Sequence, residues 1–259
     1  MIKITPFNEI FCIVDTDIIT KNKLINLFSI QEPGFFYNNS YKKGYWNGKR
    51  QLFYGKYIHI GLISFIKKYA KMYNIEVVDY VNIENEYDIK SHEDFVKKLK
   101  LPFEIRPYQL DAINYCIHNK KNLVISPTSS GKSLIIYMLV RYMQEHKRNN
   151  NKIIVIVPSK LLVKQMYDDF NQYSLNDDEW NIEENCSRIS SEFDKDFSKD
   201  IIISTYQSLV NKDIEFFKQF ECVLLDECQG AQSYTDKKAK QLHGILDNCV
   251  NSKYRIGLT

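Results

Sequence analysis

Hydrophobic and polar positions follow two different patterns along the chain, and the change comes near residue 102. Before it, short apolar runs with a period of two or of about 3.6 predict a small α+β unit. We expect strands at residues 2–5, 10–14 and 75–78, a hairpin of strands 51–54 and 57–60 around Gly55-Lys56, and helices at residues 21–30 and 61–73. A further short helix is expected at residues 93–100, beyond this unit. The polar stretch 82–90 is predicted to be a linker.

Beyond residue 102, apolar runs of strand length recur and alternate with helical segments. The runs lie at residues 123–126, 153–157, 201–204, 223–225 and 254–258. Nearly continuous apolar strands separated by helices indicate a parallel sheet that is covered on both faces. We therefore expect two domains: a small α+β domain in residues 1–90, and in residues 91–259 a doubly wound α/β domain whose ligand lies at the carboxyl ends of the strands.

Composition excludes several classes of protein. The 259 residues are 44% hydrophobic and 26% charged, which excludes wholesale disorder and collagen-like repeats. No stretch approaches the roughly 18 uninterrupted apolar residues of a membrane span, and the N-terminal residues do not form a secretory signal. The six cysteines are scattered without a CxxC pair, so we expect reduced thiols in a cytoplasmic protein, with neither disulfides nor a zinc site.

Positive charge and aromatic residues gather in the first hundred residues, which hold 15 Lys and Arg against 11 Asp and Glu. Between Glu32 and Glu76 there is no acidic residue, while eight positive charges alternate with many aromatic rings. Cations neutralise phosphates and rings stack on bases, so we expect nucleic acid to contact this window. The expected contacts are Lys42, Lys43, Lys49 and Arg50. The alternative is a solvated basic face around an aromatic core.

A phosphate-binding loop is predicted where the strand at residues 123–125 runs through Gly131-Lys132-Ser133 into a helix at residues 134–142. Backbone N–H groups of such a loop hold phosphate oxygens. Lys132 would reach the β- and γ-phosphates and the Ser133 hydroxyl would bind Mg²⁺. Ser126 occupies the position of the usual first glycine. The expected nucleotide-binding residues are Thr128, Ser129, Ser130, Gly131, Lys132 and Ser133.

Two adjacent carboxylates end the apolar run at residues 223–225 and supply the second half of such a site. Asp226 is placed to hold Mg²⁺ and Glu227 to polarise the attacking water. A carboxylate pair after a buried strand is costly unless a cation compensates it. Together with Lys132, the pair predicts a nucleoside triphosphatase with Glu227, Lys132 and Asp226 as its catalytic residues.

Five segments resemble, in the correct order, five motifs of superfamily 2 DExH-type helicases. They are Arg106-Pro107-Tyr108-Gln109, residues 158–165, residues 204–209, Asp226-Glu227-Cys228-Gln229 and Gly257-Leu258-Thr259. The resemblance implies a RecA-like domain that binds ATP and Mg²⁺, with Arg106 and Gln109 at the adenine. It also implies that Ser159, Lys160 and Thr205 contact the DNA backbone. Gln229, which is also expected among the cofactor-binding residues, replaces the family histidine that links the nucleotide site to the last motif.

The segment Gly44-Tyr45-Trp46-Asn47-Gly48-Lys49-Arg50 resembles the N-terminal domain of the UvsW family of phage helicases. That resemblance implies ATP-driven recombination and branch migration on forked DNA, Holliday junctions and R-loops, in the cytoplasm of a bacterial host. It covers about the first half of a family member. Without the second RecA-like domain and its arginine finger, we expect this chain, as a monomer, to bind ATP–Mg²⁺ weakly and to hydrolyse ATP slowly.

Two other functions fit parts of the pattern. A phage DNA-packaging motor or nuclease-linked translocase also pairs a phosphate loop with Asp-Glu, but the Tyr-Gln element and the two DNA motifs argue against it. A nucleic-acid-binding module could carry an ATP site that does not turn over. For Ser159 and Thr205 the alternative to a DNA contact is helix capping, which Ser and Thr commonly perform.

Overall fold

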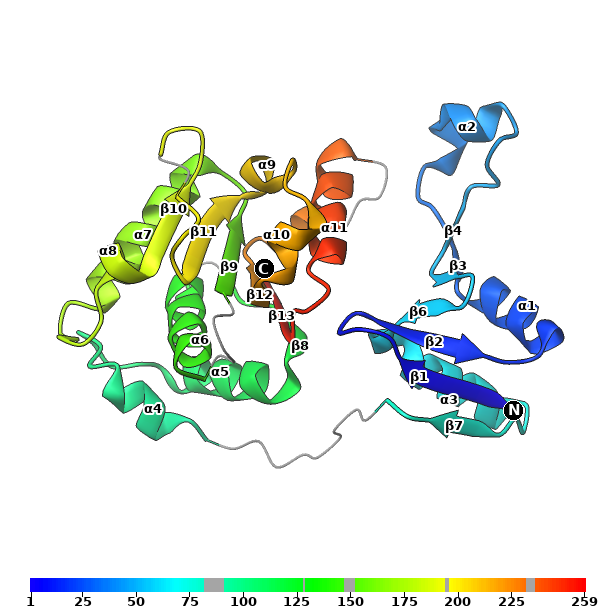
Figure 1. The fold of residues 1–259 in the computed structure, drawn as a ribbon, viewed down its shortest axis with the longest axis horizontal. Coiled ribbons are helices and arrows are strands. Elements are labelled where there is room, and N and C mark those ends of the chain that lie inside the picture. The colour runs from blue at the N-terminus through cyan, green and yellow to red at the C-terminus, as the bar shows by residue number, and fades with distance from the viewer. Residues whose placement is uncertain (82–90, 128, 147–151, 194–195, 232–235) are drawn as a thin grey trace. The chain divides into compact units, whose positions relative to one another are not determined.

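The computed structural model describes residues 1–81, 91–127, 129–146, 152–193, 196–231 and 236–259 (Figure 1). Two compact units make up the chain, Met1–Asn85 and Glu86–Thr259. The predicted linker, residues 82–90, and the predicted phosphate ligand Thr128 lie outside the described residues.

Unit 1 is built on a five-stranded sheet with the order β5-β6-β2-β1-β7. Its strands are β1 (Ile2–Pro6), β2 (Phe11–Asp15), β5 (Phe53–Tyr54), β6 (Tyr57–His59) and β7 (Val77–Asp79). β7 runs parallel to β1, while the other pairs are antiparallel. Alternate residues such as Ile2 and Ile4 are fully buried, because one face of the sheet packs on α1 (Ile18–Leu27) and α3 (Ile63–Met72).

The helix predicted at residues 21–30 is shifted toward the N-terminus. α1 begins at Ile18, because the Asp17 carboxylate accepts a hydrogen bond from the Thr20 amide at 2.9 Å and caps the helix. It ends at Leu27, because residues 29–31 pair as strand β3 (Ser29–Gln31) with β4 (Lys49–Gln51). These two strands and the segment between them, residues 29–51, form a projection that we call the arm, with helix α2 (Asn39–Lys42) at its end (Figure 1).

Unit 2 confirms the predicted doubly wound α/β class. Six strands, all parallel, follow the order β10-β11-β9-β12-β13-β8. Their bounds are β8 (Lys121–Val124), β9 (Lys152–Val157), β10 (Cys186–Ile189), β11 (Ile201–Thr205), β12 (Phe220–Leu225) and β13 (Tyr254–Leu258). The main helices are α5 (Pro107–Asn119), α6 (Lys132–His146), α7 (Lys160–Tyr173) and α11 (Lys237–Asn248). Shorter helices are α4 (Glu93–Lys98), α8 (Ile182–Asn185), α9 (Tyr206–Leu209) and α10 (Ile214–Lys218).

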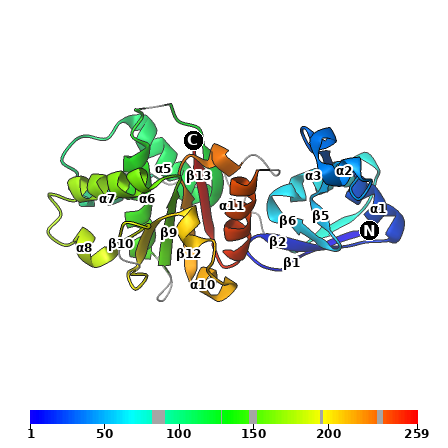
Figure 2. The ribbon, with the colours of Figure 1, turned by 90° about the horizontal axis from the view of Figure 1, so that it is seen from above.

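Helices cover both faces of this sheet (Figure 2). Along β9, Val155 and Val157 point into the layer that contains α5, α6 and α7, whereas Ile154 and Ile156 point into the layer of α9, α10 and α11. Because both faces are covered, the central strands are apolar over most of their length, which explains the continuous apolar runs in the sequence.

Strands of unit 2 differ from the prediction in their bounds. β12 begins at Phe220 rather than at residue 223, β11 ends one residue later than predicted, and further differences are at β8 and β10. β8 covers residues 121–124 rather than 123–126, because it is an edge strand that pairs only with β13 and therefore tolerates the polar Lys121 and Asn122. β10 was not predicted, because its short sequence Cys-Ser-Arg-Ile lacks a clear apolar pattern. In the described parts of the chain, every helix is too short or too polar to cross a membrane.

Candidate nucleotide-binding site

The loop between β8 and α6 is held at its β8 end by backbone contacts with Thr259. The Thr259 amide donates to the carbonyl of Val124 at 3.0 Å, and the Ser126 amide donates to the carbonyl of Thr259 at 2.8 Å. Within the loop, Ser129 and Gly131 have left-handed backbones, with φ of +64° and +83°. Left-handed residues directly before a helix are typical of loops whose amides bind anions, and α6 begins at the next residue, Lys132.

Gly131 is required for two reasons. Its positive φ is unfavourable for residues with a side chain, and a Cβ added there would lie 2.4 Å from Nε2 of Gln109. That nitrogen donates to the carbonyl of Ser130 at 2.9 Å. The glycine therefore lets the end of the loop approach α5, so the predicted adenine motif and the predicted phosphate loop are in direct contact.

Asp226 follows β12 at the carboxyl edge of the sheet, where its amide donates to the carbonyl of Ile156 at 2.9 Å. Its side chain is 8% exposed, and Oδ1 is buried without a hydrogen-bond partner among the described residues. Burial, and then the charge of Glu227, raise the pKa of this carboxyl group. A buried acceptor without a donor fits a cation ligand, so the residue suits the Mg²⁺ role that the sequence predicts.

Lys132 and Glu227 are brought together although 95 positions separate them. Nζ of Lys132 lies 2.7 Å from Oε1 of Glu227. The hydrogen bond from Lys132, and then one from Gln229, lower the pKa of Glu227, which keeps its carboxylate charged. Glu227 also has a φ of +51°, a conformation that costs energy in a residue with a side chain. Ser129 in the phosphate loop and Glu227 are two of the five described residues other than glycine that have a positive φ.

Gln229 connects Glu227 to the end of β13. Its Nε2 donates to Oε2 of Glu227, and its Oε1 accepts from the Thr259 hydroxyl at 2.6 Å. A Cβ at Gly257 would lie 3.0 Å from the Cys228 sulfur, so glycine allows the segment after β12 to pack on β13. The amide of Gln229 therefore makes the contacts between nucleotide site and last motif that the resemblance assigns to this position.

Ser133 has two partners on α7 that sequence reasoning missed. Its hydroxyl lies 2.8 Å from the Tyr173 hydroxyl, and as a donor near the Asp169 carboxylate it partly offsets the burial that raises the pKa of Asp169. Burial is the main cause that raises the pKa of both Asp169 and Tyr173. The one signal in the sequence is their i, i+4 spacing, which places both on one face of the helix. Nothing in that spacing identifies Ser133 as the partner.

The predicted adenine reader, Gln109, is 4% exposed. Its Oε1 accepts from the Arg106 amide at 2.9 Å, which leaves one amide hydrogen and one carbonyl lone pair for an adenine edge. Tyr108, which was not singled out, donates from its hydroxyl to the carbonyl of Ser130 at 2.8 Å and accepts from the Arg106 guanidinium at 3.0 Å. Adenine recognition by Arg106 and Gln109 stays a prediction.

The predicted DNA contacts of unit 2 lie at the carboxyl ends of β9 and β11. The Ser159 side chain accepts from the Leu162 amide at 3.3 Å, so the capping alternative holds for it. Lys160 is exposed and pairs with Glu192 at 3.0 Å. Thr205 is 3% exposed and its hydroxyl lies 3.1 Å from that of Ser208, so its side chain is turned away from solvent. Contact of these three residues with DNA stays a prediction.

The predicted DNA contacts of unit 1 lie on the arm. Lys42, Lys43 and Lys49 are exposed, and Arg50 is half-buried. Exposed rings share the arm with them, since Tyr37 is 75% and Tyr45 83% exposed. This exposure is what a phosphate- and base-contacting element requires.

In the part of the chain that the structure describes, no three His, Cys, Asp or Glu side chains gather as a protein-only metal site. Mg²⁺ commonly binds through one or two protein oxygens together with nucleotide phosphates. Ser133 and Asp226 fit that arrangement, because they follow the loop and strand whose ends meet at one edge of the sheet.

Comparison with known proteins places this geometry in a family. A family model described as ResIII, the res subunit of type III restriction enzymes, matches residues 102–259. The ATP-dependent DNA helicase uvsW of Enterobacteria phage T4 is 30% identical over 258 residues, which cover 95% of this chain and 49% of that protein. The DNA 3′-5′ translocase XPB2 of Sulfurisphaera tokodaii is 25% identical over 186 residues, which cover 67% of this chain and 36% of that one.

The fold agrees with these matches. A crystal structure of the UvsW helicase from bacteriophage T4 superposes with a TM-score of 0.84 at 26% identity, and the match covers 99% of this chain and 91% of that chain. The RecA-like fold predicted for unit 2 is thereby confirmed. This chain spans about half the length of the T4 protein and about a third of the length of the Sulfurisphaera protein.

Proposed function

The chain belongs to the ResIII family of superfamily 2 helicase-like proteins, and we propose that it is the ATP-binding half of an ATP-dependent DNA helicase or translocase. The observation that carries the proposal is the hydrogen-bonded series Lys132–Glu227–Gln229–Thr259. It connects the phosphate loop, the acidic motif and the end of β13, so a change at the nucleotide can be transmitted to the last motif of the chain.

Each residue of the site has a proposed role. Lys132 neutralises the β- and γ-phosphates, and loop amides up to Gly131 hold their oxygens. Ser133 and Asp226 hold Mg²⁺, which supplies charge neutralisation at the phosphates when bound. Glu227 orients the attacking water and accepts its proton. In the structure Glu227 is paired with Lys132, so nucleotide binding must exchange this ion pair for a Lys132–phosphate contact.

For the partners, we propose forked, branched or R-loop DNA, contacted through the arm and through the loops that follow β9 and β11. Phosphate contacts of this kind position the enzyme without reading sequence. A second RecA-like domain is the other expected partner, since it supplies the arginine finger that typically contributes 10³–10⁵ in rate. We propose that the protein acts as a monomer in the cytoplasm of a bacterial host.

The test is steady-state ATP hydrolysis by this chain with and without forked DNA. We expect slow hydrolysis that DNA stimulates and that Glu227→Gln abolishes, because the amide cannot accept the proton of the attacking water. Nucleotide binding by Glu227→Gln should persist and is measured with a fluorescent ATP analogue. Binding of ATP without hydrolysis in the wild type would favour instead a nucleic-acid-binding module with a site that does not turn over.

A second variant tests the phosphate loop itself. Lys132→Ala should lose binding of the fluorescent ATP analogue, because the residue carries the only side-chain charge of the loop. Its thermal unfolding should change little, because the ion pair with Glu227 is partly solvent-exposed. Lys164→Ala, which removes an exposed lysine on α7, is the matched control. Unchanged nucleotide affinity in Lys132→Ala would contradict the assignment.

A further inference from the structure

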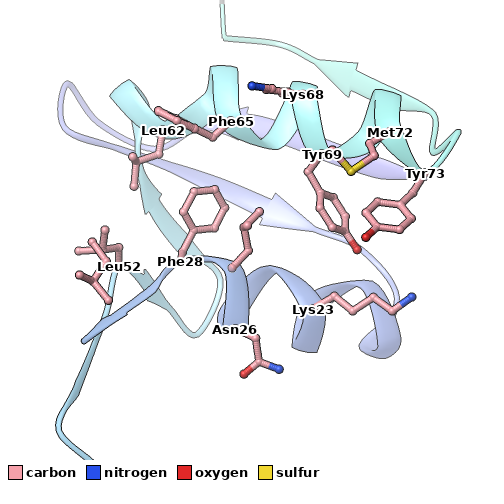
Figure 3. Close-up of a pocket in the computed structure, with 12 residues that line it drawn as sticks. Lys23, Asn26, Phe28, Leu52, Leu62, Phe65, Lys68, Tyr69, Met72 and Tyr73 are labelled. Carbon is pink, nitrogen blue, oxygen red and sulfur yellow. The ribbon is translucent and has the colours of Figure 1, made fainter. Parts of the chain in front are cut away.

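Unit 1 contains a groove whose lining residues have no role in the proposed reaction. It has a volume of about 760 Å³ and lies between α1 and α3 (Figure 3). Its lining is largely apolar, with Leu27, Phe28, Ile30, Leu52, Leu62, Phe65, Tyr69, Met72 and Tyr73 beside Lys23, Asn26 and Lys68. Several of these side chains stay in water: Phe65 is 57% and Met72 67% exposed. An exposed apolar concavity of this size is typical of an interaction site.

The charge around the groove has one sign. α1 and α3 together carry five lysines and no carboxylate, and Lys23 and Lys68 line the groove itself. Lys67 on α3 is already paired with Asp79 at 2.6 Å. Lys23 on α1 lies over the Tyr73 ring, 5.8 Å from its centroid. A partner with carboxylates therefore complements this rim, and a partner with cations is repelled.

A polar group at the floor of the groove also lacks a partner. The Tyr69 hydroxyl is buried and makes no hydrogen bond to any described residue. It points into the space between the two helices, beside the Tyr73 ring (Figure 3). Tyr73 is 55% exposed, so its rotation would open the hydroxyl to an acceptor on a docked partner. An unsatisfied buried hydroxyl is costly, which makes it a favourable donor for such a group.

We propose that this groove binds an acidic amphipathic helix of a partner protein. α1 and α3 each have ten residues, about 15 Å, which matches two to three turns of a docked helix. Its apolar residues at i, i+3, i+4 and i+7 fill the groove, its carboxylates face Lys23 and Lys68, and an acceptor meets Tyr69. A second copy of this chain does not fit, because the symmetric contact would oppose lysines with lysines.

Nucleic acid fits the groove less well than a helix. Nucleic-acid contacts go mainly to phosphates, and single-stranded bases need flat aromatic faces. Aliphatic side chains instead make up part of the lining, among them Leu27, Ile30 and Leu52, beside the rings of Phe28, Phe65, Tyr69 and Tyr73. The four predicted DNA contacts lie on the arm and do not line the groove. DNA is therefore the alternative that the experiment must separate.

The test presents the whole chain with a library of 16-residue helical peptides that share one leucine face. Their polar positions carry Asp and Glu, Lys and Arg, or Gln and Ser. We expect acidic members to be enriched and basic members to be excluded. Enrichment of basic or neutral members, or of none, overturns the proposal. Affinities of one enriched acidic peptide are then measured by fluorescence anisotropy on variants of the groove.

Matched variants identify the site. Lys23→Glu with Lys68→Glu, and Phe65→Ala, should each weaken the peptide about tenfold, and Tyr69→Phe about fivefold. The controls Lys71→Glu, on α3 outside the groove, and Phe7→Ala, an exposed ring on another element, should have little effect. Equal losses in the controls mean non-specific attraction and overturn the proposal. So does a loss of oligonucleotide affinity in Phe65→Ala and Tyr69→Phe, which would assign the groove to DNA.

Discussion

At the scale of residues, side chains that are distant in the sequence meet at the carboxyl ends of the parallel strands β8, β12 and β13. The motifs around Lys132 and Glu227 could be found in the sequence, because their spacing is local and each motif follows an apolar strand. The sequence could not reveal that Lys132 and Glu227 pair with one another in this structure. That pairing depends on strand order, and β8 is separated from β12 by β13 in the sheet.

Tyr173 is a residue outside the recognised motifs that contacts the expected Mg²⁺ site directly. Its hydroxyl lies 2.8 Å from Ser133, the expected Mg²⁺ ligand, and the two residues are 40 positions apart. When the Ser133 oxygen binds a cation, the proton of its hydroxyl group needs a hydrogen-bond acceptor. The Tyr173 oxygen and the nearby Asp169 carboxylate can accept it. We interpret Tyr173 as a positioning residue for Ser133.

Tyr173→Phe should therefore raise the Mg²⁺ concentration at half-maximal binding of a fluorescent ATP analogue about fivefold, which corresponds to one lost hydrogen bond. Binding measured without Mg²⁺ should not change, which distinguishes this role from a general loss of structure. Tyr167→Phe, on the same helix beside Arg188, is the control. An equal effect on binding with and without Mg²⁺ would refute the positioning role.

At the scale of elements, predictions from local sequence patterns were confirmed, whereas a pairing between distant segments was not predicted. The hairpin around Gly55-Lys56 and the amphipathic helix α3 were predicted because their signals lie within a few residues. The pairing of β3 with β4 was not predicted, because it joins residues about twenty positions apart through backbone hydrogen bonds that leave no periodic pattern. Without it, the basic and aromatic window gave no sign that it forms an arm.

The arm carries the predicted DNA contacts, and charge reversal tests them. Changing Lys42, Lys43, Lys49 and Arg50 to Glu should weaken binding of forked DNA and make log Kd less dependent on log salt, by up to about three to four units of slope. The control reverses four exposed lysines of unit 2, namely Lys97, Lys98, Lys100 and Lys121, for the same change in net charge. Similar losses in both variants would mean that only net charge matters.

Substitutions at two glycines test the conformation of the arm without changing its charge. Gly44 and Gly48 both have positive φ. A Cβ added at Gly48 would lie 2.5 Å from the Phe35 ring, whereas a Cβ added at Gly44 would have no neighbouring atom within 4 Å. Gly48→Ala must therefore displace the Phe35 ring, which lies against Gly48 within the arm. Amide exchange at Glu32, whose N–H donates to the carbonyl of Gly48, should become about tenfold faster. In Gly44→Ala it should stay within about twofold, and equal acceleration would mean that backbone strain alone decides.

At the scale of the whole molecule, the chain consists of two units with separate cores. The core of unit 1 includes Cys12, and the cores of unit 2 include Cys116, Cys186, Cys222 and Cys249, all buried. Burial raises the pKa of Cys12 to about 11 and those of Cys116 and Cys249 to about 12. At pH 8 these thiols are shielded and protonated, so each reacts with an alkylating reagent only when its unit opens.

Pulse alkylation in urea, read for each cysteine by mass spectrometry, should therefore resolve two transitions. Cys12 should react at the lower urea concentration, because the smaller unit buries less apolar surface per residue. The four buried thiols of unit 2 should react together at the higher one. Saturation with ATP and Mg²⁺ at about a hundred times Kd should stabilise only this second transition, by about 2.7 kcal/mol. A single transition shared by all five thiols and shifted by nucleotide would mean that the two units unfold as one.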